Sequence, residues 1–488
     1  MNTFKRKSLH AAVLAGLGAV GMAGTANAVH VNPDGLGSVL IYPYFTTRAD
    51  GGGASTAYYD NYVSIVNTTA STKAVKVRVL EGKRSAEVLD FNLFLSPFDV
   101  WTGAVVRTTD GAGMISVDRS CVVPNALFTI KDPAAITSGS LNHFKNFVYA
   151  STPADGGGTT LDRTREGYLE IFEMGDVTNA TATAAAKHNT AGVPANCAYF
   201  ETNDSTLTTA LAAPSGGLMG GLSLINVRSG SDFSYDAVAL ANWHTGTPNY
   251  SRAGDVLPRL TGGNVVTSTV FTAAGNVVAS TWANSRDAVS AAMMSQSVFN
   301  EWMLETNTAS GTDWVVTFPT KFAYTGPVGT GAAIAPFNAN FNNGLSCDIF
   351  TMNFYNREEL TTTTPVIVLP SPEPSVVVTN NTFCYEANVL TFANSNMLGS
   401  TNLYNVDTTG VGRTGWAAIN FTQTIQSLTP AASTVNGAAA AAQAHRGLPV
   451  VGFMIQDFSN GNVGTPPVLS NYGGNFNHKF FRSIGTTP

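Results

Sequence analysis

Short segments of this chain alternate apolar and polar side chains with a period of two. Over residues 73–79, valines alternate with the long cations Lys76 and Arg78. Successive side chains of a β-strand point to opposite faces of the sheet, so this pattern predicts a strand with one apolar and one polar face. We therefore expect residues 73–79 to form a half-buried strand of an antiparallel sheet.

Runs of β-branched and aromatic residues recur along the chain, separated by clusters of Gly, Asn, Asp, Ser and Thr that favour turns. Pro97 ends one of these runs, because proline cannot donate a hydrogen bond to a neighbouring strand. Many short strands joined by polar loops predict a mainly β fold, with an antiparallel β-sandwich or jelly-roll-like architecture and long polar loops. The further runs predicted to be strands are 39–44, 62–66, 88–95, 168–174, 314–318, 349–354, 376–378 and 450–455.

One segment has helical periodicity instead. Between about 285 and 304, apolar residues recur three and four positions apart, and Ser285 and Asp287 suit the N-cap and the first turn of a helix. We predict one amphipathic helix there, packed over a sheet. A run of alanines at 438–442 predicts either a second helix or a loop of small residues.

The first 28 residues have the three parts of a secretory signal peptide. Basic residues at 5–7 precede an apolar stretch at 9–24, and residues 26–28 give the small–x–small pattern of a cleavage site. The apolar stretch is too short for a stable membrane span. We expect a mature chain that begins at Val29 and is exported to the cell surface, the medium or the periplasm.

Composition narrows the classes of partner. The chain has 32 Asp and Glu against 26 Lys and Arg, and no basic cluster in its body, which argues against binding to nucleic acid or to anionic membranes. No later run of about 18 apolar residues occurs, so no transmembrane helix is expected. With 44% hydrophobic and 10% aromatic residues, the 488-residue chain has ample material for a core.

The cysteine count agrees with export. The four cysteines allow three pairings, and an even number is typical of a protein from an oxidising compartment. Sequence proximity favours Cys121 with Cys197 and Cys347 with Cys384; buried free thiols are the alternative. A zinc site is disfavoured, because no cysteine pair or neighbouring histidine has the spacing of zinc ligands.

Domain boundaries are weakly marked. The glycine-rich stretch at 214–221 is either a linker or a turn inside one domain. If it is a linker, an N-terminal β-rich domain spans 29–213 and a C-terminal β-rich domain with the helix spans 222–488. The proline-rich segment at 365–374 predicts an extended, exposed loop.

Motifs for chemistry are sparse, and no catalytic or cofactor-binding residue is predicted. The glycine pattern at 410–415 lacks the strand and the acidic residue of a dinucleotide site. Calcium stays open as a ligand, because scattered carboxylates can bind it without a motif. Glu170 and Asp99 are the best candidates for a glycosidase pair. Trp101 and Trp243 are candidates for stacking on a sugar ring, although strand aromatics more often lie in the core.

Several blocks of the sequence are distinctive: VNPDGLG at 31–37, LIYPYFT at 40–46, VLDFN at 88–92, LSPFDVWT at 95–102 and TDWVVTFPTK at 312–321. In these blocks the chain resembles a group of uncharacterised exported proteins of Gram-negative bacteria. The resemblance implies export and one shared fold, and it brings no reaction and no catalytic residues.

Three functions remain in competition. The first is a non-enzymatic cell-surface or secreted protein with a structural or interaction role, S-layer-like or part of a matrix, which associates with itself or with surface glycans and proteins. The second is a carbohydrate-binding or glycoside-processing β-sandwich. The third is a porin-like outer-membrane barrel, since the length would accommodate about 16 strands.

Overall fold

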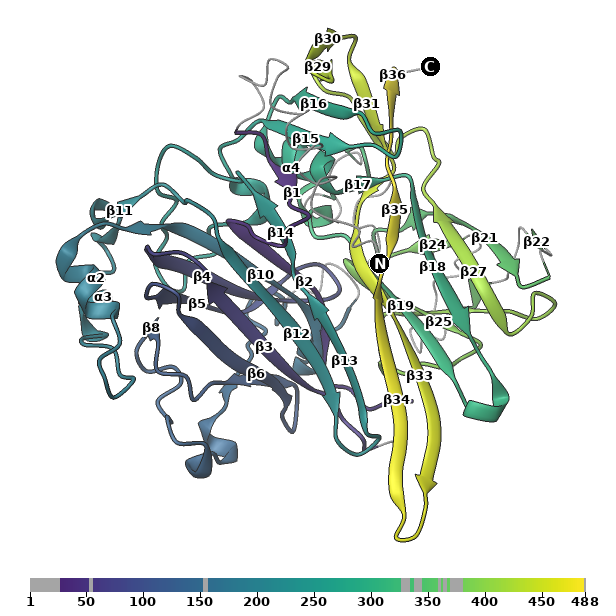
Figure 1. Ribbon diagram of the computed structural model, residues 1–488, viewed down its shortest axis with the longest axis horizontal. Helices are drawn as coiled ribbons and strands as arrows, with labels where there is room; N and C mark the ends of the chain where they lie inside the picture. The colour runs from purple at the N-terminus through teal and green to yellow at the C-terminus, as the bar shows by residue number, and fades with distance from the viewer. Residues whose placement is uncertain are drawn as a thin grey trace, which may run out of the picture.

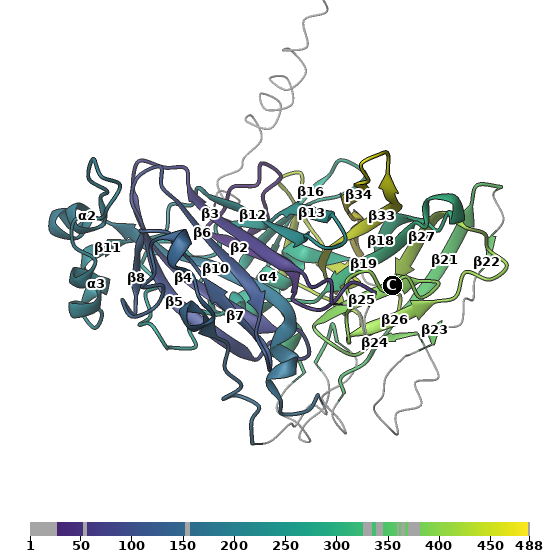
Figure 2. The ribbon, with the colours of Figure 1, turned by 90° about the horizontal axis from the view of Figure 1, so that it is seen from below.

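The computed structural model describes residues 27–51, 56–151, 157–325, 334–337, 345–358, 361–362, 367–368 and 381–486. Almost all of the predicted signal peptide, the predicted strand at 376–378 and most of the proline-rich segment at 365–374 lie outside the described residues. The described chain is mainly β, as predicted, and its strands form antiparallel sheets that pack face to face (Figures 1 and 2).

Two sheets of the first half form a sandwich. The first has the order β1 (His30–Val31), β14 (Val238–Ala241), β2 (Val39–Thr46), β10 (Glu166–Val177), β4 (Thr72–Glu81), β5 (Glu87–Leu95) and β8 (Cys121–Val123), with β11 (Leu211–Ala212) also on β10. The second has the order β13 (Ser231–Asp236), β12 (Leu218–Asn226), β3 (Asp60–Asn67), β6 (Val100–Arg107), β7 (Ala112–Ile115) and β9 (Asn142–His143). The short helices α2 (Ala180–Ala186) and α3 (Ala198–Thr202) lie at the outer end of this sandwich (Figure 1).

Two larger sheets of the second half also face each other. One has the order β23 (Ile367–Val368), β26 (Leu403–Val406), β25 (Ala387–Phe392), β19 (Gly311–Thr317), β33 (Val451–Val463) and β34 (Val468–Asn477); β25 and β26 pair in parallel. The other has the order β22 (Thr361–Thr362), β21 (Thr351–Asn356), β27 (Thr414–Asn420), β18 (Ser297–Met303) and β35 (Lys479–Phe481).

Small sheets complete the second half. Their members are β15 (Thr267–Phe271), β16 (Val277–Thr281), β29 (Ala432–Val435) and β30 (Ala438–Ala440); β17 (Met294–Ser295) and β32 (Leu448–Pro449); β20 (Asp348–Ile349) and β24 (Thr382–Phe383); and β28 (Ser427–Leu428), β31 (Gln443–Arg446) and β36 (Ser483–Thr486). The alanine run at 438–442 therefore contributes a strand, because Ala438–Ala440 pair with β29.

The prediction of a half-buried strand at β4 is wrong, since both of its faces are buried. The cationic face is covered by residues of a distant loop, and Lys76 Nζ donates to the carbonyl of Arg252 at 2.7 Å. Each long cation on that face also has a carboxylate: Lys76 lies 2.8 Å from Asp90, and Arg78 lies 3.0 Å from Glu170. Ion pairing is what allows charged side chains to be buried at all.

The predicted helix is half as long as expected. Helix α4 spans Ser285–Met293, and its N-cap is Asn284, whose side chain accepts from the backbone N–H of Asp287. Ser285 instead donates to the carbonyl of Thr261. The second half of the predicted helix is strand β18, which pairs along its whole length with β27. Its aromatic and β-branched residues suit a sheet, and tertiary pairing overrode the apparent helical period.

Two large hydrophobic clusters fill the molecule, and each draws on both sides of the expected boundary at 214–221. One combines Val39 and Leu240 with Trp314 and other residues of the second half. The other lies between the first two sheets and includes Phe453. The glycine-rich stretch enters β12, which pairs with β3, so it adjoins a sheet of the first half. A division into two domains stays a prediction, and the first sandwich continues as far as β14.

Candidate functional site

The two tryptophans considered for sugar stacking are core side chains. Trp101 packs against Phe91 and Phe128, with ring centroids 5.6 and 6.0 Å away. Trp243 packs against Phe172, and its indole N–H donates to the carbonyl of Leu260 at 2.7 Å. Both tryptophans are almost completely buried, so neither ring presents a face to a sugar.

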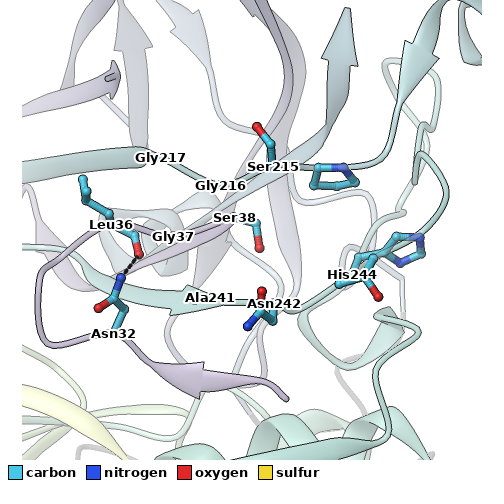
Figure 3. Close-up of a pocket in the computed structure, with 12 residues that line it drawn as sticks. Asn32, Leu36, Gly37, Ser38, Ser215, Gly216, Gly217, Ala241, Asn242 and His244 are labelled. Carbon is cyan, nitrogen blue, oxygen red and sulfur yellow. Dashed lines mark hydrogen bonds between the residues drawn. The ribbon is translucent and has the colours of Figure 1, made fainter. Parts of the chain in front are cut away.

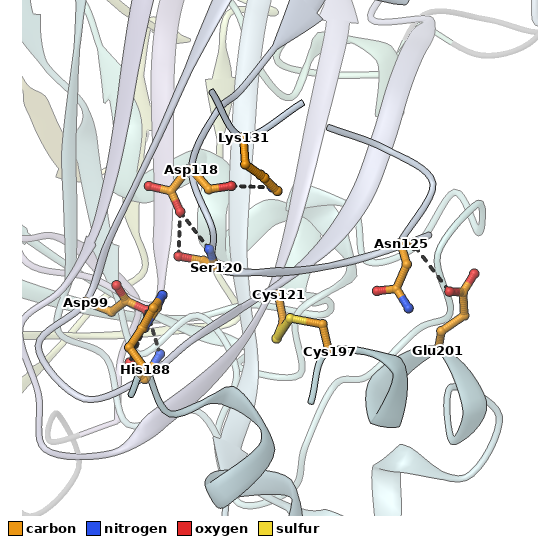
Figure 4. Close-up of a disulfide and its surroundings, with 10 residues drawn as sticks. Asp99, Asp118, Ser120, Cys121, Asn125, Lys131, His188, Cys197 and Glu201 are labelled. Atoms are coloured by element: carbon orange, nitrogen blue, oxygen red, sulfur yellow. Dashed lines mark hydrogen bonds and ion pairs between the residues drawn. A yellow bond between two sulfur atoms is a disulfide. The ribbon is translucent and has the colours of Figure 1, made fainter. Parts of the chain in front are cut away.

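All four cysteines are disulfide-bonded, in the pairs that sequence proximity favours. Cys121 in β8 is bonded to Cys197, the residue before α3 (Figure 4). Cys347 is bonded to Cys384. The first bridge fastens the segment that carries α2 and α3 to the edge of the first sheet. Two disulfides are typical of proteins from oxidising compartments.

Near the first disulfide, Asp99 lies beside His188 (Figure 4). The Ser96 hydroxyl donates to the Asp99 carboxylate at 3.1 Å. The Ser96 hydroxyl and the Asp99 carboxylate approach the same ring nitrogen of His188, Nδ1, at 3.3 and 3.6 Å. A Ser–His–Asp proton relay needs the hydroxyl and the carboxylate on opposite ring nitrogens, so this arrangement is no relay. Glu170, the other candidate acid, is fully buried and paired with Arg78. The two carboxyl groups therefore do not face each other across an open cleft.

Over the part of the chain that the structure describes, no three His, Cys, Asp or Glu side chains gather closely enough to hold a metal ion, and no helix is long and apolar enough to cross a membrane. The remaining candidates for a functional site are exposed surfaces and cavities. Two features stand out: a projecting hairpin and a polar pocket.

The hairpin of β33 and β34 projects from the body of the second sandwich (Figure 1). Side chains at alternate positions of β34 point to one face, and on that face the exposed fraction rises from 50% at Phe476 to 60% at Tyr472 and 64% at Val468. Val463 of β33 pairs with Val468 and is also exposed. We call these four residues the hairpin face.

The hairpin face is an uncovered continuation of the core. Met454, which pairs with Phe476, is on the same face of the sheet and belongs to the hydrophobic cluster that includes Trp314. Near the body, β18 covers this face, and Asn300 of β18 donates to the carbonyl of Phe476 at 3.2 Å. Towards the tip of the hairpin, the sheet that contains β18 no longer covers this face, so the apolar side chains there are exposed to solvent.

The hairpin also lacks the charges that usually protect an edge strand. The first half covers part of the outer edge of β34, where the Asn471 amide donates to the carbonyl of Ser229 and Gly473 lies close to the Phe233 ring. Residues 458–477 include no Asp, Glu, Lys or Arg, although β34 is the edge strand of its sheet. Natural edge strands commonly carry charged residues that prevent association. This charge-free stretch of twenty residues was visible in the sequence and was the signal that could have identified the surface.

The second feature is a pocket of about 200 Å³ in the first half (Figure 3). Its walls are the start of β2 with Ser38, the glycine-rich turn with Ser215 and Gly216, and the segment after β14 with Asn242 and His244. Ser38 and His244 are 3% and 8% exposed. These residues come together only in the fold, so sequence spacing gave no signal of the pocket.

Comparisons of the chain with protein-family models, with curated proteins and with solved structures give no match. The hairpin face and the pocket are therefore the features of this chain that bear on its function.

Proposed function

We propose that this chain is an exported, non-enzymatic surface or secreted protein that works by associating with further copies of itself, as in a layer or matrix. The observation that carries the proposal is the hairpin face: four exposed apolar side chains on a projecting hairpin whose residues 458–477 include no charged side chain. Contiguous apolar surface of this kind marks interaction sites on soluble proteins.

A second copy of the chain is the partner that this surface favours. Two identical charged surfaces repel each other, but two copies of the hairpin face bring no like charges together. Packing one face against another would replace the sheet that covers the same strands near the body. Tyr472 lies between Phe476 and Val468 on the hairpin face, and tyrosine is enriched in protein interfaces.

The test is the association state of the chain from Val29 to Pro488. We expect sedimentation velocity to show concentration-dependent assembly, with sheets or filaments in negative-stain micrographs. Tyr472→Glu places a charge in the centre of the hairpin face and should leave a monomer. Tyr62→Glu alters an exposed tyrosine of β3, away from the hairpin, and should assemble like the wild type.

Two results would contradict the proposal. One is a wild-type chain that stays monomeric at every concentration accessible to sedimentation. The other is a Tyr472→Glu variant that assembles as the wild type does. Recovery of the natural protein in the cytoplasm, rather than at the surface or in the medium, would contradict the proposed export.

A further inference from the structure

The second half buries a lysine completely, in contact with a carboxylate. Lys321 Nζ lies 3.0 Å from Asp348 Oδ2, and neither side chain has any exposed surface. Nζ also donates to the backbone carbonyls of Ser346 and Phe383, at 2.5 and 3.3 Å. Taking two charges out of water is costly, and the attraction within a buried pair often fails to offset that cost. A change that removes both charges can therefore stabilise such a site.

The surroundings of Lys321 Nζ are aromatic. The ring centroids of Phe318 and Phe337 lie 5.8 and 5.7 Å from Nζ, and the Phe318 ring packs against that of Phe383 at 5.8 Å. All three rings are fully buried. An amine and a carboxylic acid form an amide by losing water, and in bulk water both hydrolysis and ionisation oppose this reaction. A site that excludes water weakens both effects.

A third ionisable group, Glu386, acts on the same site. Glu386 is completely buried, and its Oε1 atom has no hydrogen-bond partner among the described residues. Its other carboxyl oxygen accepts from Ser85 Oγ. Burial raises the pKa of Glu386 to about 8, although the hydrogen bond from Ser85 and the charge of Lys321 act in the opposite direction. At neutral pH most of this carboxyl is protonated, so it can give one proton and take another, as general acid–base catalysis requires.

The segment that carries Asp348 is fixed beside Lys321. Asp348 in β20 pairs with Phe383 in β24, and the adjacent residues Cys347 and Cys384 are joined by the second disulfide. The carbonyl of Phe383 is one of those that accept from Lys321 Nζ. Holding two reacting groups in contact converts a bimolecular step into a unimolecular one and removes much of its entropic barrier.

We propose that Lys321 and Asp348 condense to an intramolecular amide bond once the chain has folded, with Glu386 transferring the protons. Proton transfer within the ion pair gives a neutral amine and a neutral carboxylic acid. The two carbonyls that accept from Nζ can hold both N–H groups of the amine, which leaves its lone pair for Cγ of Asp348. The Nζ–Cγ bond forms and one Cγ–O bond breaks. Glu386 gives a proton to the departing hydroxyl, which leaves as water, and takes one from Nζ, so it ends as it began.

Mass spectrometry of the purified mature chain tests the proposal, since an amide bond survives reduction and denaturation. After reduction of both disulfides, we expect a chain lighter than its sequence by the mass of one water molecule. A digest with chymotrypsin should contain a branched peptide in which Lys321 is joined to Asp348. Lys76 lies 2.8 Å from Asp90, whose side chain is 11% exposed, and this less enclosed pair should give only unjoined peptides.

Three variants identify the groups involved. Lys321→Arg keeps the positive charge but lacks the amine, so it should have the full mass of its sequence. Glu386→Gln has no carboxyl proton to give and should leave most of the chain unjoined. Lys479→Arg changes an exposed lysine of β35 and should retain the loss of water. Thermal unfolding and the Cys347–Cys384 disulfide in each variant check that the chain has folded.

A wild-type chain with the full mass of its sequence would overturn the proposal, and this result requires no variant. A loss of water that persists in Lys321→Arg would also overturn it, because the water would then come from another site. A folded Glu386→Gln variant that joins Lys321 to Asp348 as completely as the wild type would overturn the role of Glu386. The bond should form in Tyr472→Glu even if assembly through the hairpin face fails, which separates the two proposals.

Discussion

The two sandwiches of this molecule stabilise their interiors by different means. In the first, charged groups are buried in pairs: Lys73 Nζ lies 2.7 Å from both Glu173 and Asp176, and Lys73 and Glu173 have no exposed side-chain surface. The second also buries an ion pair, but its centre is aromatic. Trp314 packs against Phe392 and against the neutral ring of His478, with centroids 5.3 and 5.4 Å away.

Because of this difference, we expect the two halves to tolerate different disturbances. A buried cation and its carboxylates depend on one another, because either charge alone would be desolvated without compensation. A buried neutral histidine depends instead on staying unprotonated. The first half should therefore be sensitive to loss of one charge, and the second half should be sensitive to acid.

The largest expected effect follows from removing one member of the ion pairs in the first half. Lys73→Met leaves two carboxylates without their cation, and Glu173 also holds the glycine-rich turn. We expect a loss of about 3–5 kcal/mol in the free energy of unfolding, measured by urea denaturation. Lys187→Met changes an exposed lysine and should stay within about 0.5 kcal/mol of the wild type. A loss below about 1 kcal/mol in Lys73→Met would show that the buried charges are dispensable.

The next effect should arise in the second half at low pH. Burial lowers the pKa of His445 and of His478 to about 4. The unfolded chain takes up these protons near pH 6.5, whereas the folded chain takes them up only near pH 4. The stabilisation that each neutral histidine contributes is therefore complete above pH 6.5 and is lost as the pH falls towards 4, by up to about 3 kcal/mol. Burial raises the pKa of Asp313 to about 6 and that of Glu386 to about 8, and these carboxyls act in the opposite direction, so the difference between the wild type and the histidine variants isolates the histidine contribution.

The measurement is the free energy of unfolding from pH 7.5 to 4.5 in the wild type, His478→Gln and His445→Gln. His478 Nε2 lies 2.9 Å from the carbonyl of Val315, and Nδ1 lies 3.0 Å from the Asn300 amide, so the neutral ring is satisfied on both sides. Each glutamine variant should lose stability at pH 7.5 and show a flatter decline with acid. A wild-type decline that neither substitution reduces would contradict the assignment to these rings.

The contrast between the halves also separates what sequence could predict from what it could not. The strands were predictable because the period-two pattern at 73–79 is a local property of the chain. The burial of Lys76 was not, because the covering carbonyl of Arg252 is far away in the sequence. Whether the polar face of a strand is also buried depends on tertiary contacts. The alternation of apolar and polar residues identifies only which face is the more apolar.

The same limit applies to the candidate sites. The charge-free stretch at 458–477 is legible in the sequence, but the exposure of Tyr472 depends on where the covering sheet ends. Ser38 and His244 meet in one pocket only because β2 and β14 pair. Trp101 and Trp243 attracted attention as large aromatic residues, and the fold uses both as core.

The smallest predicted effect concerns α4, where a helix and a strand divide one apparently periodic segment. Asn284 accepts from the backbone N–H of Asp287 at 2.9 Å and caps the helix. Asn284→Ala should cost about 1 kcal/mol, and Asn284→Ser should lose less, because a serine hydroxyl caps about as well and brings no second carboxylate beside Asp287, to which the Asn284 amide donates at 2.8 Å. Urea denaturation measures both variants. Equal losses in both would show that the cap adds nothing beyond packing, and the position of α4 would then depend on its buried residues, which include Ala288 and Ala291.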